Sequence, residues 1–323
     1  SFVYNKIVPQ TPSLIDGSVK LSIPLYDLTY GNISIPFSLE YHGSGIKVYD
    51  DPSPSGYGWI FSPGLRITRT IMGRPDEQYV WKSLNDGTMD DYIFLKSGIS
   101  DDNGNNPNTS LIDTQHDIYN IILWNNQYTF ILKRVDNQLK AITQGNNLKI
   151  IVHENPMCFE VTDENGTKYY FKDYTEHLEI PRYTTAWMLQ KIVLINGEEL
   201  TFEWEGYSHF INSGSQFGAN ALRDSQDLST GGTSPAYTNS SEYAIMSRYG
   251  TYGKLQHLSH IKFPGGDVSI NYKTGRSPFI KKMSIKNLNG DFVDNINFSY
   301  GTTFKDSCLL NNISFLNGDI YSF

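Results

Sequence analysis

Short runs of alternating apolar and polar residues recur along most of the chain. Residues 33–41 (ISIPFSLEY), 128–132 (YTFIL) and 268–272 (VSINY) show this pattern, whereas runs with helical periodicity are hard to find. A period of two residues places every second side chain on one face of an extended strand, as a half-buried antiparallel sheet requires. The sequence therefore predicts an all-β fold with few or no helices.

Turn signals separate these runs and give a second constraint. Asp-Gly, Asn-Gly and Gly-Gly pairs tolerate the positive φ angles of tight hairpins, and they begin at residues 16, 86, 165, 196, 265, 289 and 317. In five hairpins a β-branched apolar residue precedes a glycine by five positions. These pairs are Val161 and Gly166, Ile192 and Gly197, Ile261 and Gly266, Ile285 and Gly290, and Ile313 and Gly318. Repetition predicts antiparallel hairpins side by side in a large curved sheet or open shell, although any β-rich chain contains many hairpins.

The charge distribution restricts the partners. The formal net charge is −8 and the longest basic run is Lys281-Lys282, whereas a nucleic-acid-binding protein normally carries a basic face. No apolar run reaches the length of a membrane span. We therefore expect neither a nucleic-acid partner nor a membrane span.

No clear linker divides the chain, so we expect one continuous β-rich unit over residues 1–323, with room for a sub-boundary near residues 150–158. Two polar stretches, 97–117 and 206–253, are predicted to be long surface loops, the second with a short helix around residues 220–228 as one alternative. Ordered domains rarely contain loops of this length without a function. The second stretch would present a contact surface for a protein or a glycan, formed by Tyr237, Tyr243, Tyr249 and Tyr252.

A compact motif lies within residues 54–77. Its positions are Gly56, Gly58 and Trp59, then Ile67, Thr68 and Arg69, then Gly73, Pro75 and Asp76. This motif resembles a segment near the start of RHS/YD-repeat proteins, especially those of Bacteroidetes. It is also similar to the N-terminal region of toxin-complex B-type subunits and of related Salmonella virulence-plasmid proteins. Residues 22–48 and 184–204 resemble other parts of the same region.

The resemblance implies a scaffold. In that family the repeats form a large β shell, and this region would form or cap one end of it, in contact with the rest of the shell or with a neighbouring chain. It implies a bacterial protein that is secreted, periplasmic or on the outer surface. The sequence departs from the family at Pro63-Gly64-Leu65, where two glycines are usual, and it contains no run of YD repeats, no self-cleaving segment and no toxin domain.

The motif also has a direct physical interpretation. Gly56, Gly58 and Gly64 let the backbone turn tightly around Trp59, a large side chain that buries much apolar area. Arg69 and Arg74 flank the turn, and Asp76 and Glu77 lie close in sequence. We expect a buried or half-buried salt-bridged corner, with an anion-binding site as the alternative.

Two acidic patterns invite a catalytic or metal-binding interpretation. Glu203 and Glu205 would share one face of a strand, as in ADP-ribosyltransferases, but the other motifs of those enzymes are missing and a solvated strand face explains the pair. Residues 101–106 (DDNGNN) resemble a calcium loop, yet Ile112 stands where such a loop needs a bidentate Glu. An exposed polar turn is the simpler interpretation, and weak calcium binding stays open.

Histidine and cysteine give no stronger signal. His257 and His260 have no third metal ligand nearby in sequence, and Cys158 and Cys308 are either two free thiols or a pair. We therefore expect no catalytic residue, no cofactor and no metal. The predicted function is a non-catalytic structural or interaction module. A glycan-binding module is the alternative, followed by a saccharide hydrolase with two carboxylates across a cleft.

Overall fold

The fold was taken from a computed structural model. It describes residues 19–43, 52–72, 76, 79–82, 92–95, 112–113, 116–123, 126–135, 138–143, 145, 147–179, 182–219, 244–273, 278–301 and 308–323. Within these ranges every regular element is a β-strand and every strand pair is antiparallel. The predicted all-β class is confirmed.

The strands form three sheets. The first contains β1 (Val19–Tyr30), β2 (Ile33–Gly43) and β3 (Trp59–Ser62), and a small one contains β5 (Tyr79–Lys82), β6 (Tyr92–Leu95) and β7 (Ile112–Asp113). The main sheet contains β4 (Arg66–Thr70), β8 (Ile118–Leu123), β9 (Asn126–Val135), β10 (Gln138–Thr143), β11 (Lys149–Glu154), β12 (Met157–Thr162), β13 (Lys168–Phe171), β14 (Thr175–Glu179), β15 (Arg182–Met188), β16 (Lys191–Val193), β17 (Glu199–Ala219), β18 (Ala244–Phe263), β19 (Gly266–Lys273), β20 (Phe279–Asn287), β21 (Phe292–Tyr300), β22 (Leu310–Ser314) and β23 (Ile320–Ser322).

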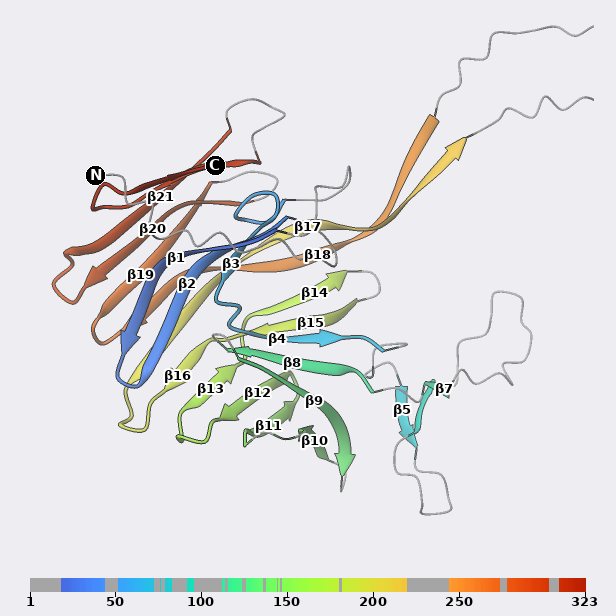
Figure 1. Cartoon of the computed structure of the whole chain (residues 1–323). Coiled ribbons are helices and arrows are strands. Elements are labelled where there is room, and N and C mark those ends of the chain that lie inside the picture. The colour runs from blue at the N-terminus through green and yellow to red at the C-terminus, as the bar shows by residue number, and fades with distance from the viewer. Residues whose placement is uncertain are drawn as a thin grey trace, which may run out of the picture.

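The main sheet curls strongly (Figure 1). Strands β16 to β23 pair in chain order, and β13 pairs with β16. The long strand β18 has β17 along one edge and both β19 and β14 along the other. From β14 the sheet continues through β15, β4, β8, β9 and β10, which lies next to β11. The strands thus form a nearly closed ring, from which β19 to β23 extend as a wall.

The five predicted hairpins lie in this one sheet, as expected from the repeated frame. Their β-branched positions, Val161, Ile192, Ile261, Ile285 and Ile313, are all fully buried. Four turns share one geometry, with the glycine at a φ between 80° and 89° and its amide bonded to the carbonyl three residues earlier. The third hairpin differs, because Phe263 pairs directly with Gly266 and leaves a two-residue turn.

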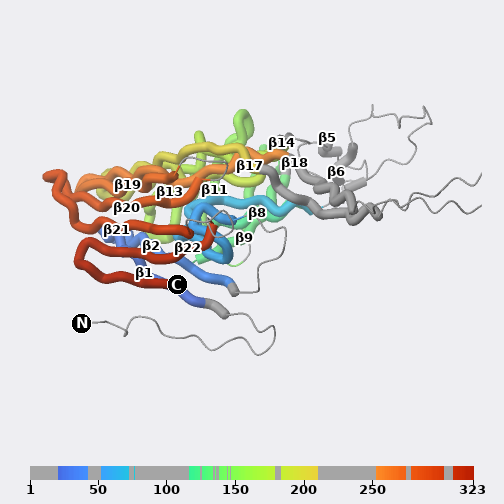
Figure 2. The backbone as a smooth tube through the Cα atoms, turned by 90° about the horizontal axis from the view of Figure 1, so that it is seen from above, coloured from blue at the N-terminus to red at the C-terminus, as the bar shows by residue number. Residues whose placement is uncertain are grey.

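The first sheet covers the wall of the main sheet. Figure 2 shows β1 and β2 beside β21 and β22. Their inward-facing residues alternate along each strand and join one hydrophobic core with the main sheet. In β2 these are Ile33, Ile35, Phe37 and Leu39, and in β1 a bulge between Pro24 and Tyr26 adds Leu25 to Ile23 and Leu28.

The predicted loop over residues 206–253 is wrong for the half of the stretch that the structure describes. Residues 206–219 and 244–253 belong to β17 and β18, which pair from Thr201 with Lys262 to Ala219 with Ala244. They form a ribbon that extends away from the sheet (Figure 1). The sequence of this ribbon is polar and rich in glycine, and it lacks the period-two pattern of apolar residues that predicted the other strands.

The other predicted boundaries have mixed outcomes. Most of the loop 97–117 lies outside the described residues, but Ile112 and Asp113 form β7. The segment around residues 220–228, where a helix was one alternative, also lies outside them. Residues 150–158 lie within the β11–β12 hairpin of the main sheet. In the part of the chain that the structure covers, no helix is long and apolar enough to cross a lipid bilayer.

Candidate functional site

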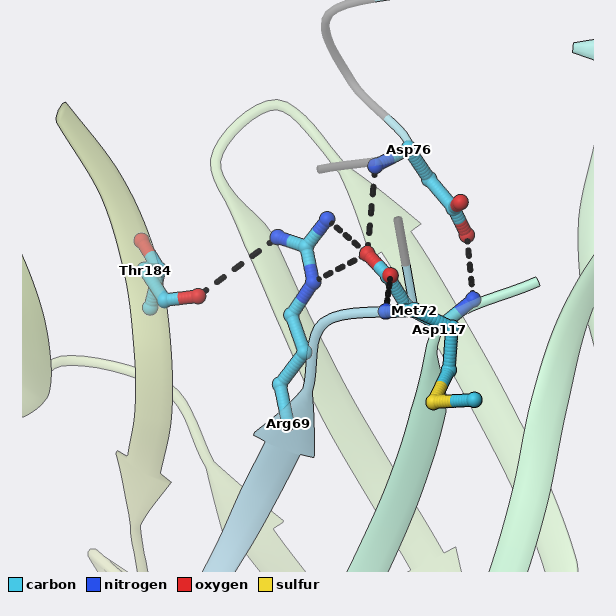
Figure 3. A network of polar contacts seen from close by, with 5 residues as sticks. All are labelled: Arg69, Met72, Asp76, Asp117 and Thr184. Carbon is cyan, nitrogen blue, oxygen red and sulfur yellow. Dashed lines mark hydrogen bonds and ion pairs between the residues drawn. The ribbon is translucent and has the colours of Figure 1, made fainter. Parts of the chain in front are cut away.

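Arg69 occupies a position of β4 that faces the core. The alternation of β4 places Leu65, Ile67 and Arg69 on the buried side. A charge there requires a partner, because an unpaired ion is costly to bury. Asp117, immediately before β8, supplies it: Arg69 Nε and Nη2 donate to Asp117 Oδ2 at 2.7 and 2.5 Å (Figure 3). The two side chains are 1% and 0% exposed.

The same carboxylate fixes the chain that follows β4. Asp117 Oδ1 accepts the Met72 amide at 2.9 Å, and Oδ2 accepts the Asp76 amide at 3.1 Å. Asp76 Oδ2 in turn accepts the Asp117 amide at 3.2 Å, and Arg69 Nη1 lies 3.5 Å from the Thr184 carbonyl of β15 (Figure 3). The network therefore joins β4, β15 and the start of β8 within the ring.

Two residues of the sequence motif, Arg69 and Asp76, are connected in this network by Asp117, which the sequence analysis did not identify. Asp117 is 48 residues from Arg69 in sequence. The chain has 34 acidic residues, so only the tertiary fold selects this one. Gly73, Arg74, Pro75 and Glu77 lie outside the described residues. The buried counter-charge of Arg69 does not favour the alternative of an anion site at that residue.

Trp59 belongs to a separate corner at the other end of the motif. Gly56 and Gly58 have φ angles of 101° and 76°. A Cβ at Gly56 would lie 2.9 Å from the Cys308 carbonyl, and one at Gly58 would lie 2.6 Å from the Tyr41 ring. Both positions therefore require glycine.

The corner ties the first sheet to the C-terminal strands. The Trp59 ring packs on Tyr41 and Phe323 with ring centroids 5.0 and 4.9 Å away. The Tyr57 amide donates to the Cys308 carbonyl, and the Ile280 amide donates to the Pro54 carbonyl. The corner thus holds three segments together that are distant in sequence.

Glu203 and Glu205 face basic groups of β18 across the strand pair. Glu203 contacts Lys262 Nζ at 2.5 Å and His260 Nδ1 at 3.7 Å. The hydrogen bond from Lys262 is the main reason why the pKa of Glu203 lies below its ordinary value. Glu205 lies 3.5 Å from His257 Nε2. The Glu-x-Glu pair is therefore part of a charged ladder between two strands.

His257 lies at the base of the ribbon and is buried. Its ring centroid is 3.9 Å from that of Tyr272 and 5.5 Å from that of Tyr207. Burial lowers its pKa, which the nearby Glu205 opposes. His260 contacts Asp267 at 3.1 Å. Among the described residues, no group of three or more His, Cys, Asp or Glu side chains is placed to hold a metal ion.

The remaining candidates lie partly outside the structure. The calcium-like segment 101–106 and the residues Tyr237 and Tyr243 are not described. Tyr249 lies in β18 without a described side chain, and Tyr252 is exposed. Cys158 and Cys308 are not joined by a disulfide bond, and burial raises the pKa of Cys158.

Two open pockets lie on the described surface, and neither was found from the sequence. One, of about 260 Å³, is lined by Tyr207, His209, Leu255, Ser53 and three prolines. Burial, followed by the charge of Glu176, raises the pKa of Tyr207 to about 12. The other, of about 250 Å³, lies between β1 and the β22–β23 hairpin and is called the acidic pocket below.

The comparisons with known proteins give similarity in structure only. No protein-family model and no curated protein matches the chain. The N-terminal domain of the effector protein SpvB from Salmonella typhimurium strain LT2 is similar, with 11% identity and a TM-score of 0.43 over 91% of this chain and 98% of that one.

Two toxin structures are similar to the same degree. The Tc holotoxin pore of Photorhabdus luminescens has 11% identity and a TM-score of 0.43 over 98% of this chain, and TcdB2-TccC3-TEV has 12% and 0.43 over all of it. The chain spans 16% of each of those chains. With TM-scores below 0.5, neither family membership nor a residue's role follows from these similarities.

Proposed function

We propose that this chain is a non-catalytic structural and interaction module of a secreted or surface bacterial protein of the RHS type, where it forms or caps a β shell. The observation that carries the proposal is the nearly closed ring of strands with its attached wall, whose inner residues belong to one hydrophobic core shared with the first sheet. An array of antiparallel hairpins is suited to continue into, or to dock against, further sheet at its edges.

The polar groups that suggested chemistry support the same proposal. Glu203 and Glu205 face Lys262, His260 and His257 in a cross-strand ladder. Such pairing orients carboxylates within the sheet and does not direct two of them across a cleft, as glycoside hydrolysis needs. The Arg69–Asp117 network is enclosed within the sheet and holds strands in place.

Cross-linking in the native protein tests the proposal. Lysine-specific cross-linking of the protein in its bacterial source, followed by mass spectrometry, is expected to join lysines of the wall, such as Lys281, Lys282 and Lys286, to further polypeptide. A parallel screen of the purified chain against polysaccharides is expected to release no reducing ends. Turnover that disappears in Glu203→Gln, together with an absence of such cross-links, would reject the proposal in favour of an enzyme.

A glycan-binding module is the second candidate, and the Tyr207 pocket is the observation that favours it. Aromatic and proline side chains line it, and an aromatic ring can stack on a sugar face. A glycan array probed with the wild-type chain and with Tyr207→Ala tests this candidate. Binding that is lost in Tyr207→Ala would support a glycan site, and an array without any bound glycan would remove it.

A further inference from the structure

The acidic pocket has walls from two sheets. Pro24, Leu25, Tyr26 and Asp27, at the bulge of β1, form one wall. The opposite wall comes from Asp294 of β21 and from the β22–β23 hairpin, whose Phe315 and Tyr321 rings pack edge to face at 5.7 Å. A volume of about 250 Å³ is below that of a typical small-molecule site. It suits one long side chain better than a whole cofactor.

The polar lining of this pocket is negative. Its three ionisable carboxyl groups are Asp27, Asp294 and Asp319. None of them forms an ion pair with a lysine, arginine or histidine in the described ranges. Burial is the main reason why the pKa values of Tyr26 and Tyr321 are raised. The charge of Asp294 adds to the effect on Tyr26 and the charge of Asp319 to the effect on Tyr321, so these carboxylates lie close to the aromatic lining.

The turn between β16 and β17 is equivalent to the β22–β23 turn, but its carboxylate has different surroundings. In that turn Glu198 occupies the position of Asp319, and its proximity to Tyr30 of β1 raises the pKa of that tyrosine. In the β22–β23 turn the corresponding carboxylate borders an open pocket. It therefore provides a negative charge that the chain itself does not neutralise in the described structure.

An exposed aliphatic residue adjoins the pocket. Leu316 is 55% exposed. The Leu316 amide donates to Asp294 Oδ1 at 3.3 Å, which places this residue at the pocket. Apolar side chains beside a charged, concave centre are typical of protein-contact surfaces, where arginine is enriched.

We propose that the acidic pocket binds an arginine or lysine side chain of a protein partner, while Leu316 contacts an apolar residue that flanks this side chain in the partner. The inference rests on the proposed interaction function and adds the place and the chemistry of one contact. Charge complementarity carries it: three carboxylates and the aromatic rings of Tyr26, Phe315 and Tyr321 line the pocket, and both kinds of group favour an organic cation. Arginine fits both features, since its planar guanidinium pairs with carboxylates and stacks on rings.

A peptide titration tests the proposal on the full chain. The probe is acetyl-Ile-Arg-Ile-amide, and its control contains citrulline, which has nearly the same shape without the charge. Amide chemical shifts of the isotope-labelled protein report where the peptide binds. We expect saturable shifts around Tyr26 and Asn317, with an affinity at least about tenfold higher for the arginine peptide than for the citrulline peptide.

Two double variants separate the pocket from general charge. Asp27→Asn with Asp319→Asn removes two pocket carboxylates, and it is expected to lower the affinity for the arginine peptide at least about tenfold. Glu164→Gln with Asp291→Asn removes two exposed carboxylates from equivalent turns elsewhere and is expected to leave it unchanged. Both variants alter exposed side chains only, so their melting temperatures should match.

Three results would overturn the docking site: no saturable shifts, equal affinity for the two peptides, or an equal loss in both double variants. Any of them could occur while cross-links to neighbouring polypeptide persist, in which case the proposed function survives without this contact. If the peptide binds but no native cross-links form, the docking site in the acidic pocket is supported and the proposed function in a β shell is rejected.

Discussion

Replacement of Asp117 would leave the Arg69 guanidinium buried without its counter-charge. Asp117→Asn also weakens the contacts to the Met72 and Asp76 amides. Breaking a buried ion pair from one side typically costs about 3–5 kcal/mol. We expect a loss of that size in the free energy of unfolding, measured by chemical denaturation.

Glu203→Gln is the matched control for this prediction. It breaks the contact with Lys262, whose side chain is 55% exposed, and exposed ion pairs contribute only about 0–1 kcal/mol. Equal losses for the two variants would contradict a special role of the buried network. The sequence predicted a salt-bridged corner here, with Asp76 and Glu77 as the nearby acids. Proximity along the chain cannot reveal Asp117, which folding brings in from the residue before β8.

Glycines at the hairpin turns differ in what surrounds them. Gly318 has a φ of 89° with open space around it, whereas a Cβ at Gly266 would lie 2.0 Å from the Lys286 carbonyl. Gly318→Ala should cost about 1–2 kcal/mol for the left-handed backbone alone. Gly266→Ala should cost clearly more, because β20 must move. Denaturation curves of both variants test this order, and similar losses would contradict it.

Hairpins are the level at which the sequence was most informative. The paired turn residues located the hairpins. The β-branched residue five positions before a turn glycine such as Gly197 or Gly318 was predicted to be buried, because a period of two residues fixes which side chains face the core. The frame failed to distinguish the third hairpin, where Pro264 and Gly265 make a shorter turn with the same spacing. It also missed the ribbon of β17 and β18, because the polar, glycine-rich sequence of the ribbon shows no apolar alternation to detect.

The base of that ribbon should respond to pH through His257. Burial lowers its pKa from the ordinary value of 6.5, although Glu205 favours the charged form, and Tyr207 and Tyr272 face its ring. The unfolded chain therefore takes up the proton at a higher pH than the folded one. The stability that neutral His257 allows is complete above the unfolded pKa and declines as the pH falls from there towards the lowered folded pKa.

His257→Phe tests this dependence. The variant keeps an aromatic ring between Tyr207 and Tyr272 and removes the titrating group. Between about pH 7.5 and 5.5, its free energy of unfolding should fall less steeply than that of the wild type. Below that range, stability is lost through the protonation of carboxylates such as Glu203, whose pKa is lowered in the folded chain. Identical slopes for both proteins above pH 5.5 would show that His257 does not contribute.

Because the first sheet and the main sheet share one hydrophobic core, we expect them to unfold together. Ile35 and Leu39 of β2 are buried in the same cluster as Ile261 of β18 and Ile296 of β21. The Trp59 corner adds hydrogen bonds between the two sheets. Removal of the first sheet would expose the inner face of the wall to water, at about 25 cal/mol per Å² of apolar surface. Neither sheet should therefore persist without the other.

Hydrogen exchange at increasing denaturant concentration, followed by mass spectrometry, tests this coupling and the prediction of one continuous unit. Amides of β2 and of β20 should lose protection at the same denaturant concentration. Ile35→Ala, which opens a cavity in the core, should lower that concentration for both strands, since a buried Ile→Ala change costs about 2–5 kcal/mol. Separate transitions, with β20 unaffected by Ile35→Ala, would divide the chain into two folding units despite the common core. A joint shift would instead mean that a partner at either sheet stabilises the other, because binding to the native state alone raises the free energy of unfolding of the whole cooperative unit.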